Sequence, residues 1–192
     1  MKLLKSVKTI PTITAVLSVA MLALAINGCG DTTTTPEGGD TFTVAGNTLS
    51  RTVTGSGKIS FTVKGIDMDL EKDKQPIVFF YDSKGYGGGR TTGGFQGELR
   101  NYKLKYYSSN GQIASESYHG SRFSSSQSYN IVLEWQTGAG FVKSTIDGKE
   151  FSKPGGVTET FTLGIGYAPT VPGWEGAVYT NIVWPKGSKE IK

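Results

Sequence analysis

The feature that most constrains this chain is a two-residue alternation of apolar and polar side chains, which recurs along residues 41–192. In residues 58–64, for example, the apolar Ile59, Phe61 and Val63 take every second position. Because successive side chains of a strand point to opposite faces of a sheet, this spacing predicts a strand with one buried face. The same part of the chain lacks the spacing of apolar residues that is typical of helices. The sequence therefore predicts an all-β domain.

The alternation predicts about nine strands. The clear ones lie at residues 58–64, 102–107, 129–136 and 161–167, and weaker ones near 42–44, 77–81, 112–118, 142–146 and 177–184. Asn110-Gly111 and Asp147-Gly148 lie between predicted strands, and both dipeptides suit the positive backbone angles of a type I′ hairpin turn. With no helix to cover a sheet, we expect two antiparallel sheets that pack face to face in a β-sandwich.

The first 28 residues have the layout of an export signal. Lys2, Lys5 and Lys8 precede an apolar run without charges at residues 10–26. The run ends in Ile26-Asn27-Gly28-Cys29, which resembles the lipobox of bacterial lipoproteins, and it is short for a membrane-spanning helix. We therefore expect residues 1–28 to be a lipoprotein signal peptide. A plain signal peptide without lipid attachment is the alternative.

Cys29 is the only cysteine of the chain, as expected for a site of acylation rather than a disulfide. Residues 30–40 offer no apolar side chain to bury, so residues 29–40 are predicted to be the acylated cysteine and a flexible tether. Residues 41–192 then form one domain. We expect an exported protein of the bacterial cell envelope, at the outer membrane or cell surface, which touches the membrane only through its lipid anchor.

Charge argues against a nucleic-acid partner. Three of the 20 basic residues precede Cys29, which leaves 17 basic residues against 16 acidic ones in the exported part. A nucleic-acid binder is expected to carry a clear excess of basic residues.

Four segments of the chain resemble the C-terminal half of a concanavalin A-like, or laminin G-like, jelly roll. They are Tyr129-Asn-Ile-Val-Leu-Glu-Trp135, Val142-Lys-Ser-Thr-Ile-Asp-Gly-Lys149, Leu163-Gly-Ile-Gly166 and Gly173-Trp-Glu-Gly-Ala-Val-Tyr-Thr-Asn-Ile-Val-Trp184. The resemblance implies a curved two-sheet sandwich. In many relatives the concave face receives a polysaccharide, and some relatives are hydrolases, some are lyases and many only bind.

The sequence lacks the complete motifs of two enzyme classes of that superfamily. The Glu-x-Asp-x-Glu strand of the glucanases, which supplies two carboxylates on one face, is missing. Glu98-Leu99-Arg100 resembles part of a strand of jelly-roll alginate lyases, and Tyr118-His119 would offer a base and an acid. The Gln-Ile-His motif and the Tyr-Phe-Lys-Ala-Gly strand of those lyases are missing. The sequence therefore favours binding without catalysis, with a polysaccharide lyase as the second alternative.

No cofactor is expected. A single histidine and no cysteine within residues 41–192 argue against zinc and iron. Many relatives bind calcium, and Asp82 is the residue to test first, although no acidic loop has the spacing of a calcium site.

Aromatic residues are the better candidates for a binding site, because sugar rings stack on Trp and Tyr. Trp174 lies in a loop framed by proline and glycines, where exposure is expected, and Tyr86 and Arg90 lie in a glycine-rich loop. The candidate carbohydrate-binding residues are Trp174, Tyr86, Tyr107, Arg90 and Arg100. Trp135 alternates with apolar residues and is expected in the core. For Trp174 the alternative is a packing role over the end of the sandwich.

Gly164 and Gly166 share one face of the strand at 161–167, so we expect them to open room above the sheet. Tyr107, Lys103 and Lys105 would help to line that room. The predicted partner is a polysaccharide or other glycan. A structural or adhesive protein that binds another protein is the first alternative.

Overall fold

The structure is a computed structural model that describes residues 41–66, 75–87, 94–100, 103–107, 113–118, 123–138, 140–154 and 157–191. The predicted signal peptide, Cys29 and the tether lie outside these residues, as do Arg90, His119 and Asn110-Gly111. Every regular element in the described ranges is a strand. Over the same ranges, no helix has the length and apolar character needed to cross a membrane.

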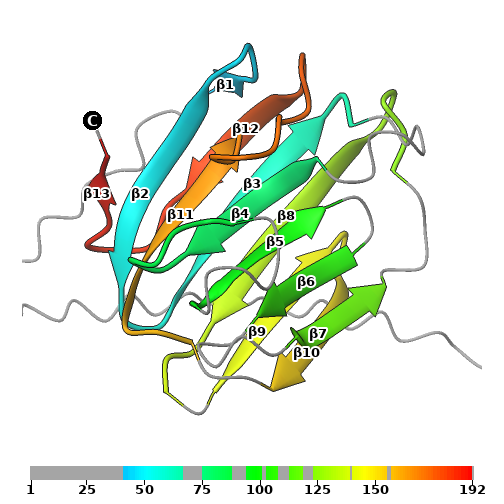
Figure 1. The fold of residues 1–192 in the computed structure, drawn as a ribbon. Helices are drawn as coiled ribbons and strands as arrows, with labels where there is room; N and C mark the ends of the chain where they lie inside the picture. Colours follow the sequence, from blue (N-terminus) through cyan, green and yellow to red (C-terminus); the bar gives the residue numbers. More distant parts are fainter. Residues whose placement is uncertain are drawn as a thin grey trace, which may run out of the picture. The chain divides into compact units, whose positions relative to one another are not determined.

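The strands form two antiparallel sheets (Figure 1). The six-stranded sheet has the order β1 (Phe42–Thr43), β12 (Val178–Val183), β3 (Gly57–Lys64), β8 (Ser128–Trp135), β9 (Phe141–Ile146) and β10 (Lys149–Pro154). The seven-stranded sheet has the order β13 (Lys189–Glu190), β2 (Thr48–Thr54), β11 (Thr160–Gly166), β4 (Pro76–Tyr81), β5 (Gln96–Arg100), β6 (Lys103–Tyr107) and β7 (Ile113–Tyr118). The chain passes repeatedly from one sheet to the other. The predicted all-β, antiparallel two-sheet sandwich of the jelly-roll type is confirmed.

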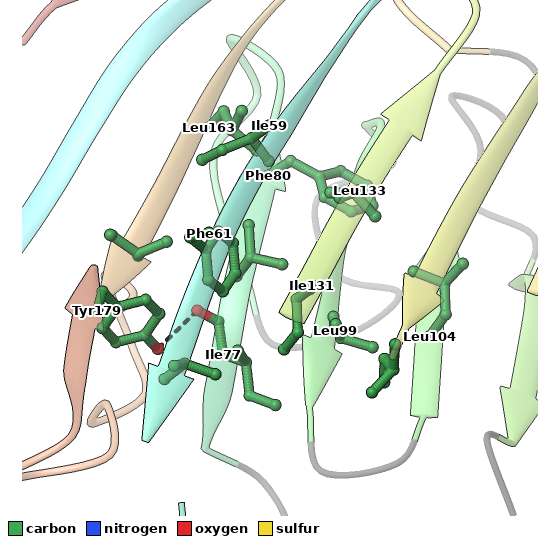
Figure 2. Close-up of a cluster of buried hydrophobic side chains, with 14 of the residues drawn as sticks. Ile59, Phe61, Ile77, Phe80, Leu99, Leu104, Ile131, Leu133, Leu163 and Tyr179 are labelled. Carbon is green, nitrogen blue, oxygen red and sulfur yellow. Dashed lines mark hydrogen bonds between the residues drawn. The ribbon is translucent and has the colours of Figure 1, made fainter. Parts of the chain in front are cut away.

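The hydrophobic core lies between the two sheets (Figure 2). Ile59, Phe61 and Val63 of β3 are all buried, as their alternation predicted. Figure 2 shows side chains of β3 and β8 in the same core as Phe80, Leu99, Leu104 and Leu163 of the other sheet. Each such side chain stabilises the fold by about 1.5–3 kcal/mol when it leaves water.

Two large aromatic side chains of the core, Tyr179 and Trp135, carry polar atoms that are hydrogen-bonded. The hydroxyl of Tyr179 on β12 donates to the carbonyl oxygen of Ile77 on β4 at 2.8 Å, which links the two sheets (Figure 2). Burial raises the pKa of Tyr179 far above its usual range, so this hydroxyl stays a donor. Trp135 is 3% exposed, and its Nε1 donates to the carbonyl oxygen of Gly55 at 2.8 Å. The predicted core position of Trp135 is confirmed.

The hairpin between β9 and β10 turns at Asp147 and Gly148, whose φ angles are 46° and 80°. These are the positive backbone angles that the dipeptide predicted. The Asp147 carboxylate also accepts a hydrogen bond from the backbone amide of Asn130 at 2.8 Å, which ties the turn to β8.

Four strands were absent from the prediction: β2, β5, β10 and β13. In β2, the charged Arg51 interrupts the apolar positions Leu49 and Val53, which weakens the alternation. The guanidinium of Arg51 lies 5.0 Å from the ring centre of Trp184. In β5, Gln96 and Glu98 alternate with Gly97 and Leu99, so the apolar signal is weak. Pairing with β4 and β6 on both sides makes β5 a strand, because tertiary context outweighs local propensity in sheets.

Candidate functional site

The outer face of the seven-stranded sheet carries a row of polar and aromatic residues across β4, β5 and β6. Phe79, Glu98 and Lys105 are register partners, and Tyr81, Gln96 and Tyr107 form the next row. Their neighbours along each strand, such as Phe80, Leu99 and Leu104, are buried in the core between the sheets. The strand alternation therefore directs Glu98 and its register partners away from that core.

Glu98 is the centre of this site. It is buried, and its Oε1 lies 3.1 Å from Nε of Arg100, the next residue along on the same face. Its Oε2 accepts a hydrogen bond from the hydroxyl of Tyr86 in the β4–β5 loop. Both oxygens of the carboxylate are thus engaged by partners from different segments.

Burial raises the pKa of Glu98 above its ordinary value. Arg100, the Tyr86 hydrogen bond and Lys105 oppose that shift because each favours the ionised carboxylate. The pKa of Tyr86 is raised strongly, first by burial and then by the charge of Glu98. Tyr86 therefore remains a neutral donor to Glu98 over the physiological pH range.

The β4–β5 loop holds Tyr86 in place through hydrogen bonds at its two ends. Asp82 Oδ1 accepts from the amide of Lys84 at 2.9 Å, and Asp82 Oδ2 accepts from the amide of Phe95 at 2.8 Å. The amide of Gly87 donates to Oε1 of Gln96 at 3.0 Å. Asp82, the first residue to test for calcium, uses both carboxylate oxygens to stabilise the loop. Within the described residues, no group of three or more metal-binding side chains is present.

A small aromatic cluster packs the loop against the sheet. The ring of Tyr86 lies 5.9 Å from that of Phe79 and 6.0 Å from that of Tyr81, in edge-on contacts. Such pairs contribute about 0.5–1.5 kcal/mol beyond the area they bury. This second hydrophobic cluster lies outside the main core and fixes Tyr86 above Glu98.

The expectation that Gly164 and Gly166 open room above the sheet is wrong. The ring of Phe79 lies directly over Gly164, where a Cβ would collide with it. Gly166 has a φ of 89°, and a Cβ there would lie 2.5 Å from the carbonyl oxygen of Asn47. Both glycines allow close packing of neighbouring groups, and their space is filled.

The expected exposure of Trp174 is also wrong. Trp174 is 2% exposed, belongs to the main core and donates from Nε1 to the carbonyl oxygen of Gln75 at 2.9 Å. Gly173 explains this burial, because a Cβ there would lie 2.6 Å from the carbonyl carbon of Gly166. The loop packs directly on the sandwich, and Trp174 has the packing role that was the alternative.

The structure brings three of the candidate residues together: Tyr86 and Arg100 both contact Glu98, and Tyr107, the register partner of Gln96, lies near Tyr86. Tyr86 and Tyr107 are each only 8% exposed, which leaves little ring surface for stacking. In the sequence, Glu98 stands out only as part of the lyase-like tripeptide Glu98-Leu99-Arg100. The signal that could have found it is Arg100 two positions along, because two opposite charges at that spacing share one face of a strand.

The chain was compared with known proteins. No family model and no curated protein matches it. Among solved structures, it is similar to the carbohydrate binding module CBM66 from Bacillus subtilis, with 10% identity and a TM-score of 0.38 over 77% of this chain and 82% of that one. It is similar to domains LG4-5 of the mouse laminin alpha1 chain, with 13% identity and a TM-score of 0.47 over 75% of this chain and 40% of that one. It is also similar to an alginate lyase of polysaccharide lyase family 7, with 11% identity and a TM-score of 0.42 over 74% of this chain and 63% of that one.

Proposed function

We propose that this protein is a carbohydrate-binding module of the bacterial cell envelope that binds a polysaccharide without cleaving it. The binding surface is the outer face of the seven-stranded sheet around Glu98, Arg100 and Tyr107. The lipid-bearing Cys29 holds the module at the membrane through the tether at residues 30–40.

The observation that carries this proposal is the ion pair of Glu98 and Arg100 outside the hydrophobic core. Removing two charges from water is costly, and a buried pair is weak evidence of a contribution to stability. The same geometry suits recognition, because a carboxylate and a guanidinium form strong hydrogen bonds with hydroxyl groups. We interpret the pair as a recognition element.

Basic residues at neighbouring positions favour a polysaccharide with acidic groups. Lys103 lies opposite Arg100 in the register of β5 and β6, and Lys105 lies opposite Glu98. The ammonium group of Lys105 lies 5.7 Å from the ring centre of Tyr107. Cationic side chains beside polar aromatic ones form a surface for carboxylate or sulfate groups on a sugar chain.

The test is a glycan array of acidic and neutral polysaccharides, probed with the detergent-purified full-length protein. We expect binding to acidic polysaccharides that falls about tenfold or more in Arg100→Gln, the loss of one charge-assisted hydrogen bond. Lys64→Ala, on the exposed end of β3 in the other sheet, is the control and should bind normally.

Two results would overturn the proposed function. One is no binding to any polysaccharide on the array. The other is the release of unsaturated sugar ends from an acidic polysaccharide, measured by absorbance, because a binding module without catalysis cannot form them.

The anchor is tested separately by labelling cells with a radioactive fatty acid. We expect label on the wild-type chain and none on Cys29→Ser, which should leave the membrane fraction. Equal labelling of both chains would contradict acylation at Cys29.

A further inference from the structure

A groove of about 500 Å³ lies at one end of the six-stranded sheet, on the sheet that does not carry Glu98. Its lining comes from the β2–β3 turn, the end of β8 and the start of β9. Small-molecule sites have volumes of about 300–1,000 Å³, so the groove has the size of a ligand site.

Gly57 and Trp135 reach the groove from the core-facing side of their strands, and its other strand residues, Lys58, Glu134 and Phe141, lie on the outer face of the sheet. Lys58 and Glu134 are register partners on β3 and β8, next to the buried Ile59 and Leu133 that face the core. Phe141, at the start of β9, is partly exposed and provides an aromatic wall. The groove therefore combines one apolar wall with polar groups.

Hydrogen bonds fix the walls relative to one another. The amide of Gln136 donates to the carbonyl oxygen of Phe141 at 2.9 Å, which closes the β8–β9 hairpin. The amide of Thr137 donates to Oγ of Ser56 at 3.1 Å, which ties the β2–β3 turn to that hairpin. A groove whose walls are already held in place loses less conformational entropy when a ligand binds.

Charges at the groove are balanced. Glu134 lies 3.1 Å from Nζ of Lys143, and Lys143 also lies 3.4 Å from Glu150. The basic residues Lys58 and Lys143 therefore balance the acidic residues Glu134 and Glu150 in and beside the groove. This balance favours an uncharged ligand over an anion or a cation.

We propose that this groove is a second ligand site, which takes a neutral saccharide unit. Phe141 matches the apolar face of a sugar ring. The Glu134 carboxylate accepts hydrogen bonds from hydroxyl groups, Lys58 donates to them, and the Gln136 amide does both. The inference does not depend on the function proposed for the face around Glu98, because the two sites share no residue.

The experiment is an NMR titration of the ¹⁵N-labelled full-length protein in detergent micelles. The probes are hexasaccharides of cellulose, xylan, amylose and β-1,3-glucan, each raised to millimolar concentration. We expect at least one probe to shift the amide signals of Gly57, Gln136 and Phe141. Glu134→Gln should weaken that binding about tenfold, as for the loss of one charge-assisted hydrogen bond, and Phe141→Ala should weaken it further.

Matched controls separate a lost contact from a disturbed fold. Glu150→Gln breaks the other ion pair of Lys143 but lies outside the groove lining, and Phe151→Ala removes a partly exposed aromatic of β10 outside it. Both controls, and Arg100→Gln, should bind the neutral probe like the wild type.

The proposal is overturned if none of the four probes shifts the groove amides, or if the controls lose as much affinity as the groove variants. It is also overturned if an acidic hexasaccharide binds the groove more tightly than every neutral one. A failed glycan array with acidic polysaccharides would leave these outcomes unaffected, so the two proposals fail separately.

Discussion

The hydroxyl of Tyr86 donates a hydrogen bond to Glu98, and through it the β4–β5 loop is attached to the outer face of the seven-stranded sheet. The two residues are 12 positions apart in the sequence. Arg100 engages the other oxygen of the same carboxylate. The loop, the ion pair and the sheet therefore form one connected polar network, in which changing one member affects the others.

Tyr86→Phe keeps the aromatic contacts with Phe79 and Tyr81 but removes the hydrogen bond to Glu98. We expect the free energy of unfolding to fall by about 1–3 kcal/mol, because a buried carboxylate oxygen loses its partner. Urea denaturation measures this change. Tyr81→Phe is the control, because Tyr81 is a tyrosine of the same aromatic cluster, and its loss should be smaller. An equal loss in both variants would contradict the specific role of Tyr86.

The raised pKa of Glu98 makes a prediction about pH. Between the ordinary pKa of 4.5 and the raised value in the folded protein, the folded state binds more protons than the unfolded state. The contribution of Glu98 to the free energy of unfolding therefore falls as the pH rises through this window. Above the window the loss in unfolding free energy stays constant. Glu98→Gln removes this dependence.

The measurement is the difference in unfolding free energy between Glu98→Gln and the wild type, taken at several pH values from 4 to 8. We expect the difference to shift in favour of the variant as the pH rises. A difference that shifts in favour of the wild type would mean that the pKa of Glu98 is lowered by Arg100 and Tyr86 more than burial raises it.

Trp174→Ala should cost about 3–5 kcal/mol of stability, the loss typical of a large buried aromatic side chain. Trp174→Phe should cost less, because a six-membered aromatic ring remains although the rest of the indole and its hydrogen bond to Gln75 are lost. Thermal unfolding of both variants measures the effect. A small loss in Trp174→Ala would show that this side chain is exposed after all and available to a ligand.

Gly164→Ala should destabilise the protein by about 1–3 kcal/mol, because the new methyl group collides with the ring of Phe79. Phe79→Leu costs stability of its own but makes room for that methyl group. In a double-mutant cycle the two changes together should therefore cost less than the sum of the single changes. Additive losses would show that the ring of Phe79 does not lie over Gly164.

Much of the fold could be predicted from alternation alone. Ile59, Phe61 and Val63 had to share a face, and Trp135 had to lie on the core side of its strand, because side-chain direction in a strand follows from sequence position. Asp147-Gly148 predicted a turn, because few residue types tolerate the positive φ angles that such a turn needs. The strand β5 was missed because Gln96 and Glu98 lack an apolar signal, and its neighbours β4 and β6 hold it in the sheet.

The candidate site shows where sequence reasoning ends. The residue types of Tyr86, Arg100 and Tyr107 were visible in the sequence, yet only strand pairing and loop packing bring them together on the outer face of the sheet. Trp174 was assigned to the surface because its loop is rich in glycine, but Gly173 lets the loop pack against Gly166 and carries the indole into the core. Alternation is a local property that the sequence by itself determines. Exposure, pKa and proximity depend on which segments pack together, and only the tertiary structure decides that.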